Sequence, residues 1–404
     1  MPVPQEQLDA YAELVVGVGV NLEPGQAFGV TAYVEHAPFV RAVARAAWAA
    51  GARDVDVRYV DEHLRKAAVQ LAPEESLGVS PPWLLDRRES YGDRSAYLLV
   101  RGHPDPRMFE DVDGARLAAS RLHEEDAIWL RQVSERRVSW SLVSFPTEGW
   151  AATVFGEPDV GRLWDAIART VRLDEPDPVA AWAEHIRRLD ARAAALNERR
   201  FDAIRFRGPG TDLLVGLHAG SRWQSAGEET AWGRPHVPNL PTEEIFTTPD
   251  RRRTEGRVRS TRPLVCQGRI VRGLEIELRA GRVVDVRAEE GAEVVQAQVA
   301  TDEGAAELGE IALVDGDSRV GREGLTFFDT LFDENASSHV AYGQGFGGCV
   351  DGAAELSPEE QWELGISQSS LHTDFMVGGP DVEIDGLTAS GEAVAIVRGD
   401  AWQL

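Results

Sequence analysis

In the first half of the chain, segments with the composition of strands alternate with segments that have helical spacing. The strand-like segments are residues 27–34 (AFGVTAYV), 54–60 (DVDVRYV), 95–100 (SAYLLV) and 139–145 (SWSLVSF). Between the first two lies 38–50 (PFVRAVARAAWAA), which has the composition of a helix. Such alternation requires helices that cross over between neighbouring strands, so it predicts an N-terminal α/β domain with a parallel sheet.

The pattern changes near residue 200. Apolar residues recur at helical spacing from Val179 to Asn197, which predicts a helix that connects two halves. Beyond it, short strand-like segments are joined by turns that contain glycine. We therefore expect a domain over residues 1–200 and an α+β C-terminal catalytic domain, rich in short strands, over residues 201–404.

Charge and cysteine content exclude several classes of protein. The formal net charge of the 404 residues is −25, which argues against nucleic-acid binding because a phosphate backbone requires a basic surface. Cys266 and Cys349 are the two cysteines, too few for a disulfide framework or a cysteine-rich zinc site. The N-terminus does not resemble a signal peptide, and the sequence predicts no membrane-spanning segment. We expect a soluble, cytoplasmic protein.

Several common catalytic motifs do not occur in the sequence. GVGVN at 17–21 lacks the third glycine of a dinucleotide-binding loop, and we interpret it as a turn. The sequence contains no P-loop, no G-x-S-x-G and no H-E-x-x-H. Chemistry must therefore come from another arrangement of residues.

Two segments of the second half place carboxylates beside apolar strands. In NLPTEEIFTTP (239–249), Glu243 and Glu244 are adjacent, so on an extended chain they point to opposite sides and one at most faces a given pocket. In LGEIALV (308–314), Glu310 begins an apolar run, where a buried carboxylate needs a charged partner or a metal ion. Either segment alone is also compatible with solvent-exposed charge.

Two further segments supply imidazoles. LFDENASSHVAYGQGF (331–346) carries Glu334 and His339, with Asn335 or a nearby serine as the cap of a predicted helix that bears His339. In SSLHTDFMVGG (369–379), His372 and Asp374 lie two residues apart, so in a strand they face the same side. A histidine in isolation is more often structural, but the four segments together offer oxygen and nitrogen donors that suit two divalent ions of zinc, cobalt or manganese.

The four segments, in this order and at this spacing, resemble the M29 peptidase family, the aminopeptidase T and aminopeptidase S (PepS-like) group. N-terminal segments such as VGVNLEPGQ and SWSLVSFPTEGWA are also similar to the family. The resemblance implies a homodimeric, metal-dependent aminopeptidase that removes N-terminal residues from peptides through a dinuclear site. It also implies the residues that bind or border the two ions, namely Glu244, Glu310, Glu334, His339, His372 and Asp374.

The chain departs from the family pattern at one position. Seven residues after the motif histidine the family has a tyrosine, and here Phe346 occupies that position. A phenyl ring donates no hydrogen bond to a developing oxyanion, and loss of one such donor costs roughly 10²–10³ in rate. If the segment is helical, Tyr342 lies one turn earlier and could substitute.

The residues therefore support two hypotheses. In the first, the ions activate a water molecule and Glu310 carries the proton to the leaving amine, with Glu334 as the other candidate. In the alternative, Phe346 leaves a metal-binding member of the family with weak, lost or different hydrolytic activity.

Overall fold

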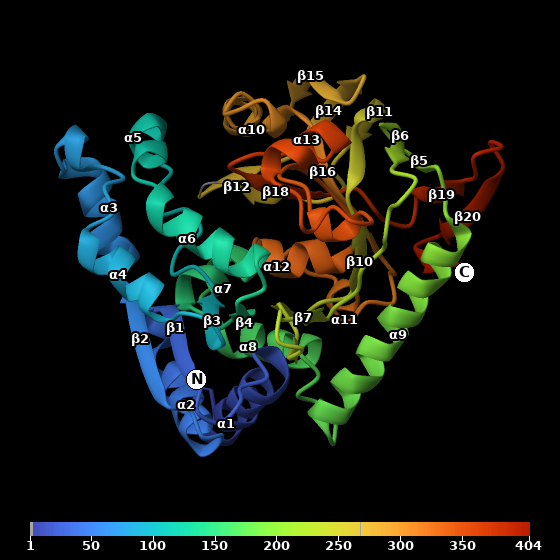
Figure 1. Cartoon of the computed structure of the whole chain (residues 1–404). Coiled ribbons are helices and arrows are strands. Elements are labelled where there is room, and N and C mark those ends of the chain that lie inside the picture. The colour runs from blue at the N-terminus through green and yellow to red at the C-terminus, as the bar shows by residue number, and fades with distance from the viewer. Residues whose placement is uncertain (1–2, 267) are drawn as a thin grey trace. The chain divides into compact units, whose positions relative to one another are not determined.

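A computed structural model describes residues 3–266 and 268–404, and the chain forms two compact units (Figure 1). The first unit runs to Ala183 and takes in Gly227–Leu240, and the second comprises Glu184–Ala226 and Pro241–Leu404. The domain limits expected from the sequence, 1–200 and 201–404, stay a prediction. No helix of the described residues is both long enough and apolar enough to cross a membrane.

The first unit is a parallel sheet between helices. Its strands are β1 (Ala27–Tyr33), β2 (Asp54–Val60), β3 (Ser95–Arg101), β4 (Val138–Ser144), β7 (Glu228–Glu229), β8 (Pro235–His236) and β9 (Asn239–Leu240). Its helices are α1 (Gln5–Leu14), α2 (Ala37–Ala49), α3 (Glu62–Leu71), α4 (Pro82–Ser90), α5 (Gly114–Ala119), α6 (His123–Ser134), α7 (Glu148–Phe155) and α8 (Val160–Thr170). The main sheet has the order β2-β1-β3-β4-β9, with every pair parallel.

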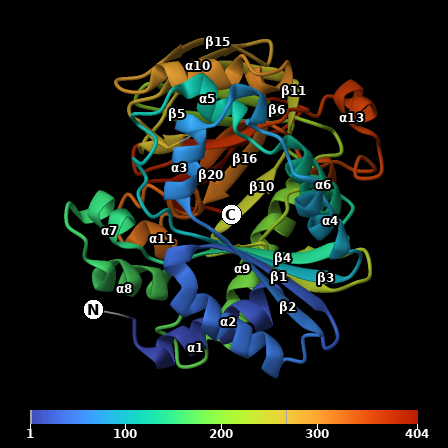
Figure 2. The same cartoon turned by 90° about the vertical axis from the view of Figure 1, so that its left-hand side faces the viewer.

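Helices cover both faces of this sheet, as crossover connections between parallel strands require. Figure 2 shows α1 and α2 on one face and α4 and α6 on the other. Tyr11 of α1 stacks on Phe39 of α2 with ring centroids 4.7 Å apart, and both side chains are fully buried. The predicted α/β domain with a parallel sheet is confirmed.

One local expectation for this unit is wrong. The sequence predicts a turn at residues 17–21, but α1 continues directly into a π-helix over Val15–Gly19. A helix, rather than a strand, therefore precedes the glycines, and the structural context of a dinucleotide-binding loop does not exist here.

The second unit is built from short antiparallel strands. They are β5 (Ala203–Gly208), β6 (Thr211–Leu217), β10 (Glu244–Thr247), β11 (Pro249–Arg259), β12 (Leu264–Cys266), β13 (Arg269–Val271), β14 (Glu275–Arg279), β15 (Arg282–Arg287), β16 (Leu308–Val314), β17 (His339–Gly343), β18 (His372–Met376), β19 (Glu383–Leu387), β20 (Ala393–Arg398) and β21 (Ala401–Trp402). The helices are α10 (Ala292–Val299), α11 (Arg319–Arg322), α12 (Thr330–Asp333) and α13 (Pro358–Leu364), and α9 (Pro178–Arg199) contributes to both units.

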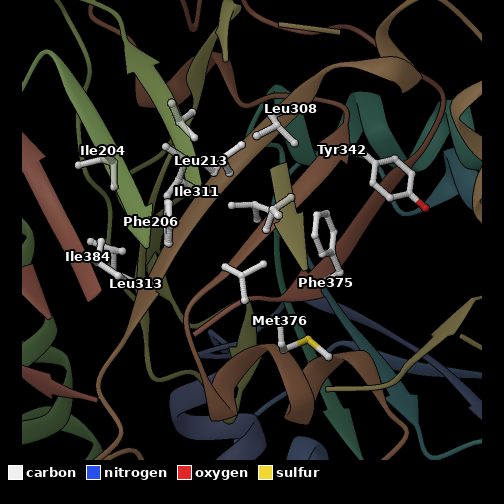
Figure 3. Packing of buried hydrophobic residues seen from close by; sticks show 14 of the residues in the cluster. Ile204, Phe206, Leu213, Leu308, Ile311, Leu313, Tyr342, Phe375, Met376 and Ile384 are labelled. Atoms are coloured by element: carbon white, nitrogen blue, oxygen red, sulfur yellow. The ribbon is translucent and has the colours of Figure 1, made fainter. Parts of the chain in front are cut away.

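Two sheets of the second unit share one hydrophobic core. An eight-stranded sheet has the order β15-β14-β11-β6-β5-β19-β20-β21, and a four-stranded sheet has the order β10-β16-β17-β18. Figure 3 shows Phe206 and Leu213 of the larger sheet in the same cluster as Ile311, Leu313 and Phe375 of the smaller one. This part of the fold matches the expected C-terminal region of many short strands. Because one face of the smaller sheet is buried in this core, its other face is left for polar groups.

Candidate metal centre

The two faces of the four-stranded sheet differ in chemistry. Alternate residues of its strands, among them Ile311, Val340 and Phe375, enter the core. The residues between them point the other way, because successive side chains of a strand alternate between faces. The polar face collects the predicted ligands, which are Glu244 from β10, Glu310 from β16, His339 from β17, and His372 and Asp374 from β18.

A β-bulge at Gly309 lets Leu308 and Glu310, two residues apart, face opposite sides of the sheet, with Leu308 in the core and Glu310 on the polar face. Leu308 pairs with Tyr342, whereas Glu310 pairs with Ala341, so β16 uses two residues where β17 uses one. Such a bulge reverses the alternation along the strand. A side chain is excluded at Gly309, because a Cβ atom there would lie 2.2 Å from the carbonyl oxygen of Gln344.

The ligand side chains meet at close range. His339 Nε2 lies 3.0 Å from Glu244 Oε2 and 4.0 Å from Asp374 Oδ1. His372 Nε2 lies 2.9 Å from Glu310 Oε2 and 3.2 Å from Asp374 Oδ1. The predicted pairing of His372 and Asp374 on one face of a strand is confirmed. Residues that are up to 130 positions apart in the sequence, Glu244 and Asp374, thus converge in one cluster.

The donor set fits divalent metal ions. Two groups of three residues, Glu244–Glu310–His339 and Glu310–His372–Asp374, each have ligand atoms within 4.8 Å of one another. Glu310 belongs to both groups. Among the described residues, Glu244 Oε2 is a buried oxygen that receives no hydrogen bond of normal geometry. A buried carboxylate is costly unless positive charge lies beside it, and here either a protonated His339 or a bound cation would supply that charge.

Electrostatic effects in the cluster reflect a shortage of positive charge. Burial alone would lower the pKa of His339, but Glu244 and the other carboxylates raise it to about 10. The pKa of His372 is likewise raised by Asp374 and Glu310 against the effect of burial. Burial also raises the pKa of Glu310. Protons on the two imidazoles thus supply the positive charge that bound metal ions would otherwise provide.

The backbone orients both imidazoles. His372 Nδ1 lies 2.8 Å from the carbonyl oxygen of Gln344, and His339 Nδ1 lies 3.3 Å from that of Ser337. When each Nδ1–H donates to its carbonyl, Nε2 is free to bind an ion, as in most histidine ligands. Gln344 and Ser337 carried no sequence signal for this role, because they act through backbone atoms.

The adjacent residues Glu243 and Glu244 contact different partners. Glu244 turns towards His339, whereas Glu243 Oε2 lies 3.5 Å from His185 Nε2 and 3.7 Å from Arg188 of α9. The backbone N–H of Glu243 donates to Asn335 Oδ1 at 2.6 Å. Asn335 therefore supports the strand that carries Glu244.

Comparisons of the whole chain with known proteins identify its family. The model of one protein family, described as thermophilic metalloprotease (M29), matches residues 4–402. This chain belongs to the M29 metalloprotease family. It is 43% identical to "Aminopeptidase T" of Thermus aquaticus and 37% identical to "Aminopeptidase PepS" of Streptococcus thermophilus, over 98% and 100% of this chain and 98% and 99% of those proteins. The solved structure titled "Wild-type AmpT from Thermus thermophilus" superposes with a TM-score of 0.91 at 39% identity, covering 99% of this chain and 100% of that one.

Membership in the M29 family confirms the expected resemblance and the expected class of enzyme, a metal-dependent hydrolase of peptide bonds. The relatives named above are aminopeptidases by name. Divalent metal use follows from the family, whereas the number and identity of the ions do not.

In this M29 protein, the local geometry expected around His339 is wrong. A capped helix was predicted there, but α12 ends at Asp333 and His339 begins strand β17. Asn335 caps no helix carrying His339; its Nδ2 donates to the carbonyl oxygen of Leu331 at 2.8 Å. Pairing with β16 and β18 on both sides makes the segment a strand.

Because this segment is a strand, the expectation that Tyr342 lies one helical turn before Phe346 is also wrong. Tyr342 lies three residues after His339, so the two side chains face opposite sides of β17. Its ring is fully buried in the core, near Phe375 (Figure 3), and its hydroxyl donates to Gln298 Oε1 of α10 at 2.5 Å. No helical turn relates Tyr342 to Phe346, and its hydroxyl is already engaged on the face away from the ligands.

Glu334 and Phe346 border the cluster. Glu334 is not part of either three-residue group, but the carboxylates of Asp374 and Glu244 add to burial in raising its pKa. The ring of Phe346 lies 5.1 Å from the ring of His372, between centroids. Phe346 is therefore adjacent to a predicted ligand.

Proposed function

We propose that this protein is an aminopeptidase that removes the N-terminal residue of peptides at a site for two divalent ions. Glu244 and His339 would hold one ion, His372 and Asp374 the other, and Glu310 would bridge them. The observation that carries the proposal is the membership of Glu310 in both groups of ligand atoms. The aminopeptidase names of relatives that match this chain from end to end support the reaction.

The side chains would divide the chemistry between them. Two ions in such a site lower the pKa of a water molecule and polarise a carbonyl group. Glu310 would be shared between the two ions, so we assign proton transfer to Glu334, which lies outside both groups. The surrounding carboxylates would attract the substrate's positively charged N-terminal amine, which restricts cleavage to the first peptide bond.

Phe346 supports a second candidate, a metal-binding M29 protein with weak or altered hydrolysis. Its ring lies against His372 but offers no hydrogen-bond donor to a developing oxyanion. If this is the limiting defect, Phe346→Tyr will raise kcat on a simple substrate by roughly tenfold or more. An unchanged kcat would remove the support for this candidate.

The decisive experiment joins metal analysis with an activity assay. The protein is stripped with a chelator, reloaded separately with zinc, cobalt or manganese, and assayed on leucine p-nitroanilide. We expect two ions per chain and activity that disappears on stripping and returns on reloading. Two bound ions with no turnover on any aminoacyl anilide would favour the second candidate, and one ion per chain would overturn the dinuclear site.

Three further properties are proposed with this function. Zinc, cobalt or manganese suits the mixed carboxylate and imidazole donors. Two cysteines, Cys266 and Cys349, are both buried, and so low a cysteine content is compatible with the cytoplasm. A homodimer follows from the family resemblance, and light scattering during size-exclusion chromatography would measure its mass directly.

A further inference from the structure

Two phenylalanines adjoin the candidate metal centre. Phe246 lies two residues after Glu244 on β10, so both side chains point to the polar face of the sheet. Its ring centroid lies 5.7 Å from that of Phe346, at an interplanar angle of 72°. Phe346 in turn lies 5.1 Å from the ring of His372. The two phenyl rings thus form a continuous aromatic pair that ends at a proposed ligand.

The aromatic pair lies at the accessible end of the cluster. The side chain of His372 is 25% exposed, whereas that of His339 is 1% exposed and that of Glu310 is 7% exposed. A substrate therefore reaches the ligands from the His372 side. Phe346, itself 36% exposed, lies on that side.

The backbone fixes the position of the pair. The N–H of Phe346 donates to Thr248 Oγ1 at 2.7 Å, and the N–H of Gly345 donates to the carbonyl oxygen of Ser367 at 2.8 Å. Phe246 is held by paired hydrogen bonds between its own backbone and that of Gln224. A rigid aromatic surface binds an apolar group without the entropy cost of ordering a loop.

We propose that Phe246 and Phe346 form the surface that receives an apolar side chain of the substrate's N-terminal residue. This inference rests on the proposed aminopeptidase function. The amine and the scissile carbonyl of that residue must both lie at the ligand cluster, so its side chain extends from the cluster by only a few ångströms. The aromatic pair is an apolar surface that begins within that distance of His372. Leucine and phenylalanine side chains would gain contact with it, and alanine would not.

A single exposed phenylalanine is ordinary on a protein surface and carries no such meaning. What distinguishes this pair is its contact with a proposed ligand, the shared sheet face of Phe246 and Glu244, and the exposure gradient across the cluster. Neither phenyl ring carries a polar atom, so the surface that the two rings form is apolar.

The test measures kcat/KM of the metal-loaded protein on p-nitroanilides of leucine, phenylalanine and alanine, in the wild type and in Phe246→Ala and Phe346→Ala. We expect the preference for leucine over alanine to fall by about tenfold in each variant, since one hydrophobic contact discriminates by roughly that factor. Ratios between substrates cancel any change in the chemistry that all three share. Phe346→Leu, which keeps an apolar side chain, is expected to retain most of the preference.

Leu214→Ala is the matched control, because Leu214 is 37% exposed and belongs to the eight-stranded sheet. It should leave the ratio unchanged. An unchanged ratio in both phenylalanine variants, with turnover preserved, would overturn this inference and leave the proposed function standing. Absence of turnover in the wild type on every anilide would instead overturn the proposed function.

Discussion

His36 in the first unit and His339 in the second are equally buried but have opposite electrostatic properties. His36 is fully buried, its Nε2 lies 3.1 Å from the carbonyl oxygen of Gly102, and burial lowers its pKa to about 4. His339 is 1% exposed, and the carboxylates around it raise its pKa to about 10. Burial by itself keeps an imidazole neutral, so it is the convergence of acids on one sheet face that raises the pKa of the second histidine and makes it part of a candidate metal centre.

The largest effect is expected from removing the carboxylate of Glu310, which belongs to both groups of ligand atoms. Glu310→Gln should lower the metal content and reduce kcat/KM by roughly 10³, because both ions lose a ligand. Glu334→Gln is the comparison variant, and it should retain both ions while losing roughly 10²–10⁴ in kcat. Metal analysis beside the kinetics separates the two. Full metal content in Glu310→Gln would contradict its bridging role.

Metal binding should make His339 neutral, as His36 already is. Because the pKa values of His339 and His372 are raised, both imidazoles are protonated at neutral pH in the metal-free protein, and ions must displace those protons. Calorimetric titration with zinc in buffers of different ionisation enthalpy should report release of about two protons per chain. Binding without proton release would show that the imidazoles are not ligands.

Acid should destabilise the first unit through His36. Its pKa is about 4 in the folded state and 6.5 in the unfolded state, so the unfolded state binds more protons between these values. The stabilisation is complete above pH 6.5 and decreases as the pH falls to about 4, by about 3 kcal/mol in total. The variant His36→Gln should lack this part of the pH dependence in thermal unfolding. Identical pH profiles for the two proteins would refute the assignment.

The smallest effect is expected for Tyr342→Phe. The hydroxyl lies on the core face, so turnover should stay within about threefold of the wild type, while loss of its bond to Gln298 should cost about 1 kcal/mol of unfolding free energy. Parallel assays of activity and thermal unfolding measure both. A large loss of activity with normal stability would return Tyr342 to the candidate catalytic residues.

The spacing of residues along the sequence was sufficient to predict much of the fold and part of the candidate site. The alternating segments of the first half gave the parallel sheet, because strand and helix periods differ along the sequence itself. The spacing of His372 and Asp374 gave their shared face for the same reason. The family-like order of four motifs gave a set of ligands, five of which the structure gathers on one sheet face.

Long-range pairing decided what local pattern could not. The segment around His339 is a strand because β16 and β18 bond to it on both sides, and these partners lie tens of residues away in the sequence. The same pairing moved Tyr342 into the core. The proximity of Phe346 to His372, and of Glu243 to α9, also depends on contacts that no single segment contains.

The bulge at Gly309 has a consequence for how this chain tolerates change in length. Deleting Gly309 would make Leu308 and Glu310 neighbours, and neighbours on a plain strand face opposite sides, so both side chains would keep their present faces. Deletions are usually harmless in loops and harmful in strands, but a deletion at this position would keep Glu310 on the face of His339 and Asp374. Inserting one residue between Glu310 and Ile311 would instead turn Glu310 towards the core, so β16 tolerates a loss of length at its bulge better than a gain of length beyond it.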